Sequence, residues 1–351
     1  MERGSFHEET GVNKVVTFAI AAYNAEKYLE KCLSSFLCAQ VLEQIEVLII
    51  NDGSQDDTER IGRGFEEKYP NIFRVISQEN RGHGGALNTA VAQARGKYFR
   101  PIDADDWVVT EQLPAYVQAL SESAADAVLT GYHTVDRNSG RRKEFPCVYD
   151  KTLTLPELME VYNEIASCCT FHGITYRTEF YRSCHMKLSE KIFYEDQEYA
   201  SLPFLYVKRV QLLPLFLYQY QLGNGEQSVA AANQVKRIEQ IEQVALRILK
   251  ELKECKNPAP MGKVYCIQKL AVVVVSYHVT ALLRNPNREL GWRQSRALYE
   301  KIEEMCPELN QLITKKLKTL QIFHRIHLPP QMYQTMLDSS LYKKLRGLWR
   351  S

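Results

Sequence analysis

The sequence predicts an α/β fold with a mostly parallel central sheet, followed by a C-terminal helical subdomain. Over the first hundred residues, short runs of β-branched or aromatic residues alternate with helix-like segments. The order β-α-β-α-β-α-β is typical of a parallel sheet that helices cover on both faces. From about residue 233 onward, apolar residues recur at helical spacing, and Asn-Pro or Cys-Pro pairs separate the segments.

The first four strands are expected to end at one edge of the sheet. Each is a short run that stops at polar or turn-forming residues. The strands cover residues 15–22, 45–50, 72–77 and 97–102, and the helices between them cover 26–38, 56–69 and 84–95. Ligands of such sheets bind outside the carboxyl ends of the strands. The polar residues that follow each strand should therefore converge on one crevice.

The rest of the chain is expected to be less regular and then helical. After Asp106 the pattern indicates a helix at 111–123, strands at 126–133 and 143–149, a helix at 156–166 and a mixed stretch to about 222. Four long helices follow, near 233–255, 263–283, 289–305 and 308–319. We therefore predict two domains, residues 14–222 with the sheet and residues 223–351 with the helices and a basic amphipathic tail.

Composition narrows the class of protein. Of the 351 residues, 45% are hydrophobic and 25% are charged, which is ordinary for a soluble globular chain. The net charge of +2 is too small to indicate a nucleic-acid partner. The nine cysteines contain no CxxC pair. This argues against a disulfide framework or a zinc site and favours a reducing cytosol.

Two segments resemble targeting or membrane segments only in part. Residues 1–13 are polar and acidic and lack the apolar core of a secretory signal. The most apolar window, residues 264–283, contains Gln268, Lys269 and His278, and a central lysine is costly in lipid. We therefore expect a buried helix there and a cytoplasmic protein.

The first two strands end in residues suited to binding a planar base. Ala22, Tyr23 and Asn24 follow the first strand, where exposed backbone groups could clasp a ligand. The second strand ends in NDGSQDDT, in which Gly53 permits a tight turn and Asp52 can point into the crevice.

A glycine-rich loop, QENRGHGG, follows the third strand and opens a helix. Its backbone could approach a ligand closely, with Asn80 and Gly85 in the loop and Asn88 in the helix. The loop matches neither the dinucleotide-binding nor the phosphate-loop fingerprint, so by itself it has low specificity.

The fourth strand ends in DADDW, with three carboxylates within four residues. Asp103, Asp105 and Asp106 repel one another unless something offsets their charge, and hard divalent cations take carboxylates together with phosphate oxygens. The alternative is a solvated acidic turn that caps a helix. The position at a strand end that should reach the crevice favours a metal site.

A second acidic pair, Glu195-Asp196, lies among aromatic residues in FYEDQEY. Such surroundings can raise the pKa of a carboxylate or fix its orientation, which suits a general base. The alternative is a group of acids at the N-terminus of a helix, where the helix dipole favours them.

Together and in this order, the motifs AAYNAEKYLEKCLSSFL, LIINDGSQDDT, ENRGHGGALNTAVAQARGKYFRPIDADDW and FYEDQEY resemble the family 2 inverting glycosyltransferases with the GT-A fold. The resemblance covers about residues 14–220. It implies that Ala22 and Asp52 contact a nucleotide base and that Asp103 faces the ribose or sugar. The residues expected along the donor are Ala22, Tyr23, Asn24, Asp52, Gly53, Asn80, Gly85, Asn88, Asp103 and Ala104.

The resemblance also implies a mechanism. Asp105 would hold Mn²⁺ or Mg²⁺ against the diphosphate, and Asp196 would take the proton of the acceptor hydroxyl. Glu195 would orient the base or bind acceptor. Metal and base then act on opposite faces of the sugar, which inverts the anomeric centre.

Two departures from the family pattern bear on the metal. Many relatives have an arginine where this chain has Leu87, although Asn88 is retained. Many also have an Arg-x-His-x-x-Ser segment, whereas this chain reads QLGNGEQS, in which only Ser228 matches. His83 and His172 are weaker candidates for a further ligand, because most histidines are structural or solvated.

The resemblance implies a transferase that uses a UDP-sugar and a glycan or lipid-linked acceptor, in the synthesis of cell-envelope polysaccharide. A dinucleotide-binding oxidoreductase would also fit the strand–helix alternation, but the glycine fingerprint after the first strand is missing. A binding module of the same fold without turnover is the second alternative. The retained Asp103, Asp105 and Asp196 argue against it.

The C-terminal segment 341–350 has the pattern of an interfacial helix. Four apolar residues share one helical face: Leu341, Leu345, Leu348 and Trp349. With Lys315, Lys316 and Lys318 upstream, the segment could hold the protein at an anionic inner leaflet, each cation contributing about 1 kcal/mol. The alternative is packing on the helical subdomain or a contact between two copies.

Liposome flotation tests the tail. We expect the full-length protein to float with anionic vesicles at low salt and a protein truncated after Ser340 to remain behind. Equal flotation of both proteins, or of neither, would mean that the tail is no anchor.

Overall fold

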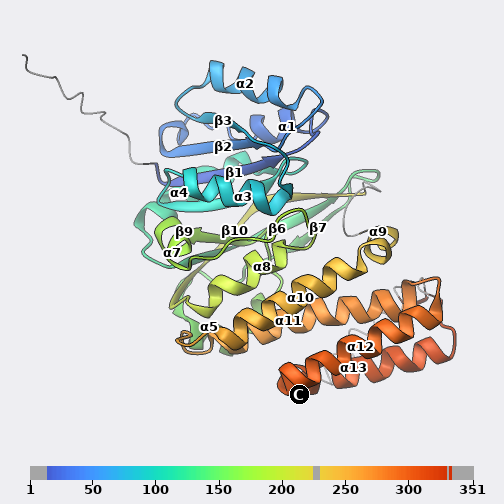
Figure 1. The fold of residues 1–351 in the computed structure, drawn as a ribbon. Coiled ribbons are helices and arrows are strands. Elements are labelled where there is room, and N and C mark those ends of the chain that lie inside the picture. Colours follow the sequence, from blue (N-terminus) through green and yellow to red (C-terminus); the bar gives the residue numbers. More distant parts are fainter. Residues whose placement is uncertain (1–13, 224–229, 330–331, 334–351) are drawn as a thin grey trace, which may run out of the picture. The chain divides into compact units, whose positions relative to one another are not determined.

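The computed structural model describes residues 14–223, 230–329 and 332–333. By its internal contacts the chain divides into two units, Met1–Gly223 with Ala259–Gly262, and Asn224–Pro258 with Lys263–Ser351 (Figure 1). That residues 222 and 223 mark a boundary between separate domains stays a prediction. Ser228 and the amphipathic segment 341–350 lie outside the described residues.

The first half of the sheet is parallel, as the sequence predicts. Its order is β3-β2-β1-β4, with strands Phe73–Ser77, Ile45–Asn51, Val16–Ala22 and Tyr98–Asp103. Ala22 lies beside Asn51 and Ala21 beside Asp103, so these strands end together. All seven residues of β2 are buried, which explains why this strand is mostly apolar; its polar members are Glu46 and Asn51.

Three helices follow these strands along the chain: α1 (Leu29–Ser34), α2 (Thr58–Lys68) and α3 (Gly82–Gln93). α2 packs on β3, whereas α3 packs on β1 and β2. A further helix, α4 (Leu113–Glu122), contributes Tyr116 to the core. The Phe18 ring of β1 lies 4.8 Å from Phe36 and 6.2 Å from Tyr116, between ring centroids. This apolar core fixes the strands whose ends carry the polar residues.

The second half of the sheet is mixed. The order continues β9-β6-β10-β5, with strands Ile174–Arg177, Ala127–Asp136, Arg209–Leu222 and Trp107–Val108. β9 is antiparallel to both β4 and β6, and β10 is parallel to β6. β6 and β10 therefore point the same way as β4 and end at the same edge. Two outer strands, β7 (Arg142–Phe145) and β8 (Lys151–Thr154), pair with β6 and β10.

β10 is the long strand that the sequence did not reveal. Its pairing with β6 shifts register between Leu213 and Phe216 and again between Phe216 and Tyr218. These irregularities remove the period of two that marks a strand in a sequence.

The short helices of this unit are α5 (Leu155–Glu160), α6 (Tyr162–Ile165), α7 (Thr178–Ser183) and α8 (Asp196–Ser201), with the 3-10 turns η1 (Leu42–Gln44), η2 (Thr110–Gln112) and η3 (Leu202–Leu205).

The second unit is helical, as predicted. Its helices are α9 (Ala231–Lys236), α10 (Ile238–Glu254), α11 (Gly262–Val279), the π-helical turn η4 (Thr280–Arg284), α12 (Arg288–Met305) and α13 (Pro307–Arg325). The segment Gly262–Arg284 is long and apolar enough to cross a membrane, but 72% of its apolar window is buried, as in the core helix of a soluble protein. Within it, the Nδ1 atom of buried His278 lies 2.8 Å from the Ser295 hydroxyl.

Candidate active site

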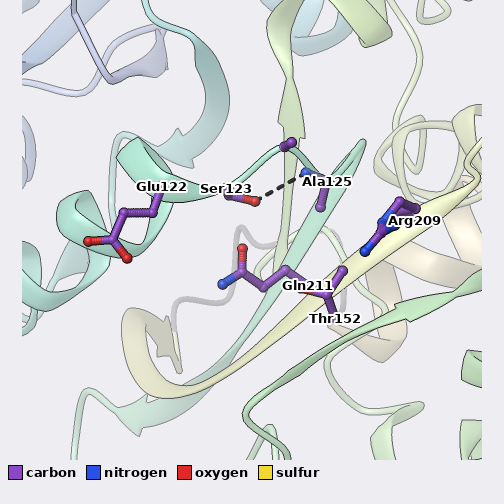
Figure 2. Close-up of a pocket in the computed structure, with 7 residues that line it drawn as sticks. Glu122, Ser123, Ala125, Thr152, Arg209 and Gln211 are labelled. Carbon is purple, nitrogen blue, oxygen red and sulfur yellow. Dashed lines mark hydrogen bonds between the residues drawn. The ribbon is translucent and has the colours of Figure 1, made fainter.

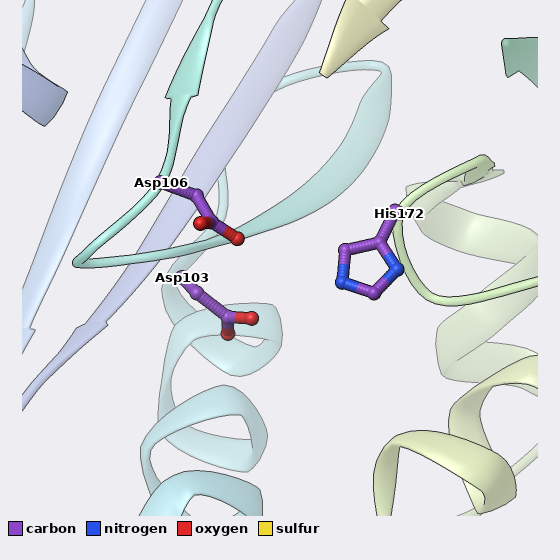
Figure 3. A group of neighbouring side chains, drawn as sticks. All are labelled: Asp103, Asp106 and His172. Carbon is purple, nitrogen blue, oxygen red and sulfur yellow. The ribbon is translucent and has the colours of Figure 1, made fainter. Parts of the chain in front are cut away.

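Three potential metal ligands converge at the carboxyl end of β4. One ligand atom each from Asp103, Asp106 and His172 lies within 4.8 Å of the other two. Figure 3 shows both carboxylates directed toward the imidazole ring. The DADD turn supplies the two acids, and the loop before β9 supplies the histidine. The sequence predicted the acidic turn at this place and gave His172 only as a weaker candidate.

Residues of β10 hold the acidic turn in place through hydrogen bonds. Asp106 is 1% exposed and accepts hydrogen bonds from the Tyr218 hydroxyl at 2.7 Å and from the Gln221 backbone N–H at 2.7 Å. The Tyr218 hydroxyl in turn accepts from the Asp103 backbone N–H at 3.1 Å. Tyr218 thus joins the two acids. Sequence reasoning missed it because β10 itself was not recognised.

A buried arginine holds the loop that carries His172. Arg100, in the middle of β4, is fully buried and donates to the backbone carbonyl of His172 and, at 3.2 Å, to that of Gly173. Its guanidinium also donates to the Thr175 hydroxyl at 2.9 Å. A buried charge is tolerated when several acceptors surround it. The motif KYFRPI contained this residue but gave no sign of its partner loop.

The His172 ring is packed and neutral. It stacks on Tyr220 with ring centroids 4.1 Å apart and meets the edge of Tyr218 at 5.0 Å. Burial lowers the pKa of His172 to about 4. A neutral imidazole has a free lone pair, which a metal ion can use.

The electrostatics of the acidic turn favour a bound cation. Burial and the neighbouring Asp103 raise the pKa of Asp105 to about 6, and burial, Asp103 and Asp105 raise that of Asp106 well above its usual value. The residues present fit a divalent ion, because two carboxylates and a neutral imidazole face one point and their repulsion would be relieved. Asp105 lies in the same turn but outside this group of three. Its role as a ligand stays a prediction.

His83 links the acidic turn to the second acidic pair. Its Nδ1 atom lies 2.6 Å from Glu195 Oε1, and its Nε2 atom lies 3.0 Å from Asp103 Oδ1. The second contact departs from hydrogen-bond geometry, so this buried nitrogen has no well-aligned acceptor among the described residues. Burial lowers the pKa of His83, but the neighbouring carboxylates of Asp103 and Glu195 outweigh burial and raise this pKa well above its usual value. The protonated ring therefore bridges two carboxylates.

Asp196 and Glu195 lie at the start of α8, in different surroundings. Glu195 is 3% exposed and bonded to His83, whereas Asp196 is half-buried with its Oδ2 accepting from Gln197 Nε2 at 2.8 Å. Burial, followed by Glu195 and Asp103, raises the pKa of Asp196 to about 6. Tyr194 precedes the pair with φ of 72°, a left-handed conformation that is costly outside glycine. Asp196 is thus the more exposed acid of the pair, and its role as the general base stays a prediction.

The glycine-rich loop packs against its own chain. A Cβ atom on Gly84 would lie 2.1 Å from the Ser189 carbonyl oxygen, and one on Gly82 would lie 2.7 Å from the Lys191 backbone nitrogen. The sequence suggested that these glycines let a ligand approach. In the structure they let the segment 188–191 approach the start of α3, which is how His83 and Glu195 come together.

The side chains of the loop reinforce this packing. Asn88 donates to the Leu188 carbonyl at 2.9 Å and accepts from the Leu188 N–H at 2.8 Å, and Arg81 pairs with Glu190. Asn88 therefore has a positioning role, and its expected donor contact stays a prediction. A Cβ on Gly85 would face Arg81 at 2.4 Å.

Replacing Gly84 with alanine is expected to destabilise the protein by about 2 kcal/mol or more, because the new methyl group must displace the Ser189 carbonyl. The matched control is Gly64→Ala in α2, where no atom lies within 4 Å of the added Cβ. That change should stabilise the helix by up to about 1 kcal/mol. Urea unfolding of both variants measures the difference. Equal stability of the two variants would show that the segment around Ser189 can move aside at no cost in free energy.

The expected base-binding residues lie together at the ends of β1 and β2. The Asp52 N–H donates to the Ala22 carbonyl at 2.9 Å. Buried Asp52 accepts from Gln78 Nε2 at 2.7 Å and from the Arg81 N–H at 2.9 Å. Both bonds use Oδ1, which leaves Oδ2 for a ligand. Gly53 has φ of 75°, as its tight turn requires.

The other expected donor residues differ in exposure. Tyr23 is 53% exposed, Asn80 is exposed and Ala104 is buried. The Asn24 side chain accepts from the Gln55 backbone N–H at 2.8 Å, so it ties the first strand end to the second. All of them follow strands that end at one sheet edge, and their contacts with a donor stay predictions.

A separate cavity of about 440 Å³ lies at the opposite end of the sheet (Figure 2). It is lined by residues that include Glu122, Thr152, Arg209 and Gln211. Arg209 begins β10, and ligands of parallel sheets bind at the carboxyl ends of the strands. This cavity is therefore distinct from the candidate active site.

Comparisons with known proteins agree with this geometry. A family model described as "Glycosyl transferase family 2" matches residues 17–193. The uncharacterized glycosyltransferase EpsJ of Bacillus subtilis is 30% identical over 213 residues, which cover 59% of this chain and 61% of that protein. Chondroitin synthase of Escherichia coli is 39% identical over 127 residues, which cover 36% of this chain and 18% of that protein. The chain thus spans less than two thirds of the length of these relatives.

A solved structure shares the fold over nearly the whole chain. TarS of S. aureus, residues 1–349, in complex with UDP-GlcNAc, superposes with a TM-score of 0.65 at 21% identity, covering 95% of this chain and 92% of that one. This likeness supports a GT-A-like arrangement of the sheet and the helices around it.

Proposed function

The chain belongs to glycosyl transferase family 2, and we propose that it is a glycosyltransferase. It would move a sugar from a nucleotide-sugar donor to an acceptor hydroxyl, with inversion and with Mn²⁺ or Mg²⁺ at the donor. One observation carries the proposal. The Asp103–Asp106–His172 group and the Glu195–Asp196 pair lie at the same sheet edge, joined through His83.

The donor is proposed to lie along the ends of β1 to β4, with its base at Ala22 and Asp52. Supporting this, Asp52 Oδ1 accepts from Gln78 and Arg81, while its Oδ2 accepts no hydrogen bond from the described residues. UDP is the carrier that we propose, because TarS was solved with UDP-GlcNAc on the same fold.

A divalent ion would be held by Asp103, Asp106 and His172, with Asp105 beside them, and would neutralise the charge of the departing diphosphate. The chain's own residues prepare this place. Arg100 fixes the His172 loop, and Tyr218 fixes both acids of the turn. Protonated His83 adds a positive charge beside Asp103 on the side of Glu195.

Asp196 is proposed as the general base. The acceptor oxygen attacks the anomeric carbon, its proton passes to Asp196, and the bond between that carbon and the diphosphate oxygen breaks. The nucleoside diphosphate leaves with the electron pair of that bond. Glu195 is held by His83 and acts as a positioning residue at the start of α8.

Donor turnover with and without Mn²⁺ tests the proposal. We expect release of UDP from a UDP-sugar that depends on Mn²⁺ and accelerates with acceptor. Tight UDP binding without any turnover would favour a binding module of the same fold. Binding of a nicotinamide dinucleotide in place of UDP would favour the oxidoreductase alternative.

The rate of transfer is expected to fall below about pH 6. A general base works only when it is ionised, and burial with nearby carboxylates raises the pKa of Asp196 to about 6. Above that pH the rate should be level, and below it the rate should fall about tenfold per pH unit. Single-turnover rates at saturating donor and metal measure this. A flat profile between about pH 4.5 and 7 would exclude Asp196 as the base.

The acceptor is proposed to be a glycan or a lipid-linked glycan, in polysaccharide synthesis at the inner side of the cell envelope. The similarity to chondroitin synthase, a polysaccharide-forming enzyme by name, supports this class of acceptor. Peripheral contact with the membrane through the C-terminal segment belongs to the same proposal.

A further inference from the structure

We propose that the turn between β6 and β7 binds an anionic acceptor, so that the glycan receiving the sugar carries carboxylate or phosphate groups. This inference rests on the proposed transferase function and adds the charge of its acceptor. The hairpin patch consists of Arg137, Arg141, Arg142 and Lys143, all exposed. It follows β6, whose carboxyl end lies at the same sheet edge as Asp103.

The four cations of the hairpin patch have no ion-pair partner among the residues that the structure describes. Among residues 14–223, none of them lies within ion-pair distance of a carboxylate, whereas Arg60 and Arg63 each pair with an acid. The two acids that flank the patch in the sequence have other partners. Asp136 accepts from the Ser139 N–H at 2.8 Å, and Glu144 lies 3.6 Å from His133 Nε2.

An aromatic stack connects the hairpin patch to the metal group. Lys143 lies 5.0 Å from the centroid of the Phe145 ring, which stacks on Tyr132 at 4.6 Å with an interplanar angle of 6°. Tyr132 lies 5.3 Å from the His172 ring. The patch is therefore within a few side chains of the expected reaction centre.

The other side of the patch reaches the start of α1. Arg137 donates to the Tyr28 hydroxyl at 2.9 Å and lies over its ring. Trp107 directly follows the acidic turn, and the Lys31 ammonium lies over its ring. Burial and the nearby charge of Arg142 lower the pKa of Lys31. Aromatic faces beside cations suit a ligand that combines sugar rings with anionic groups.

The place of the patch in the sheet favours acceptor over donor. The expected donor residues follow β1 to β4, whereas the patch follows β6, which is separated from β4 by β9. An anionic chain on these cations would run toward the metal group, where one of its hydroxyls could meet Asp196. Guanidinium groups bind carboxylates and phosphates in a bidentate manner, so either group would be recognised.

Oligosaccharide binding to the full-length protein with UDP and Mn²⁺ tests the inference. The probes are a hyaluronan hexasaccharide with carboxylates, a glycerol phosphate hexamer with phosphodiesters and neutral chitohexaose. We expect at least one anionic probe to bind at about 0.05 M salt, to weaken at about 0.5 M salt, and to outcompete chitohexaose. The anionic probe that binds more tightly identifies the acidic group.

The variant R141Q/R142Q/K143Q should weaken this binding about tenfold, as three exposed ion pairs worth two- to threefold each would predict. The control K68Q/K151Q/K208Q removes the same charge from exposed lysines elsewhere and should bind within about twofold of wild type. UDP affinity shows that both variants are folded. Equal binding of chitohexaose, or unchanged binding by the hairpin variant, would overturn the inference.

Two further outcomes are decisive. If no anionic probe binds but phosphatidylglycerol vesicles do, and the hairpin variant loses the vesicles, the patch serves a lipid surface and the inference is wrong. If the wild type binds UDP with Mn²⁺ but no anionic probe, the inference alone fails. If it does not bind UDP, the proposed function fails first.

Discussion

Replacing Asp196 with asparagine is expected to lower the rate of sugar transfer at least ~10²-fold while leaving UDP affinity unchanged. The amide has nearly the shape of the carboxylate but cannot take a proton. Its oxygen can still accept the hydrogen bond from Gln197 Nε2, which the carboxylate accepts at 2.8 Å. The start of α8 should therefore keep its conformation, and the loss should fall on the chemical step.

Single-turnover transfer and UDP titration measure the two effects separately. The matched control is Asp150→Asn, the same change at an exposed carboxylate outside the site, which should transfer at the wild-type rate. Glu195→Gln is a useful contrast, because it disturbs the 2.6 Å contact between Glu195 Oε1 and His83 Nδ1. This variant should weaken metal binding and slow proton transfer together. Transfer by the Asp196 variant within about threefold of wild type would move the base role to another group.

The sequence was most informative where structure is local. β1 to β4 are mostly apolar runs that end at polar turns, so their parallel direction and their common edge could be predicted from the pattern alone, whereas their order in the sheet could not. Asp103 and Asp52 could be placed at that edge because Asp103 ends β4 and Asp52 directly follows β2. The helical second unit was likewise visible in the spacing of its apolar residues.

The sequence was least informative where distant segments meet. β10 begins about a hundred residues after the acidic turn, yet Tyr218 on this strand bonds Asp106 at 2.7 Å. Similarly, His83 meets Glu195 across 112 positions of the chain. No local pattern encodes such a pairing. The glycines beside His83 were a signal, but their tight packing on residues 188–191 could be understood only with both segments in view.

The structure also changes how the acidic turn is interpreted. From the sequence, one carboxylate, Asp105, was expected to hold the metal. The structure brings together Asp103, Asp106 and His172, and it occupies Asp106 with two hydrogen bonds from β10. Each oxygen of Asp106 keeps a further lone pair, so these bonds orient the group without excluding a metal.

Replacing Asp105 with alanine is expected to abolish the part of UDP binding that depends on Mn²⁺, with the apparent Mn²⁺ affinity falling at least ~10²-fold, beyond the usual effect of outer-shell changes. The fold should remain intact. The pKa of Asp105 is raised to about 6 in the folded chain, above the unfolded value of about 4. Ionising this group therefore costs stability as the pH rises through that window, so the alanine variant should melt no lower than wild type at neutral pH.

Isothermal titration of UDP with and without Mn²⁺ decides which groups hold the ion. Asp150→Ala, which removes an exposed carboxylate elsewhere, controls for the change in net charge and should bind as wild type does. His172→Asn removes the imidazole of the three-residue group. If both site variants lose the Mn²⁺ dependence, Asp105 and the group of three act on one ion. If Asp105→Ala binds as wild type while His172→Asn does not, the ion belongs to Asp103, Asp106 and His172, and the metal role expected for Asp105 is wrong.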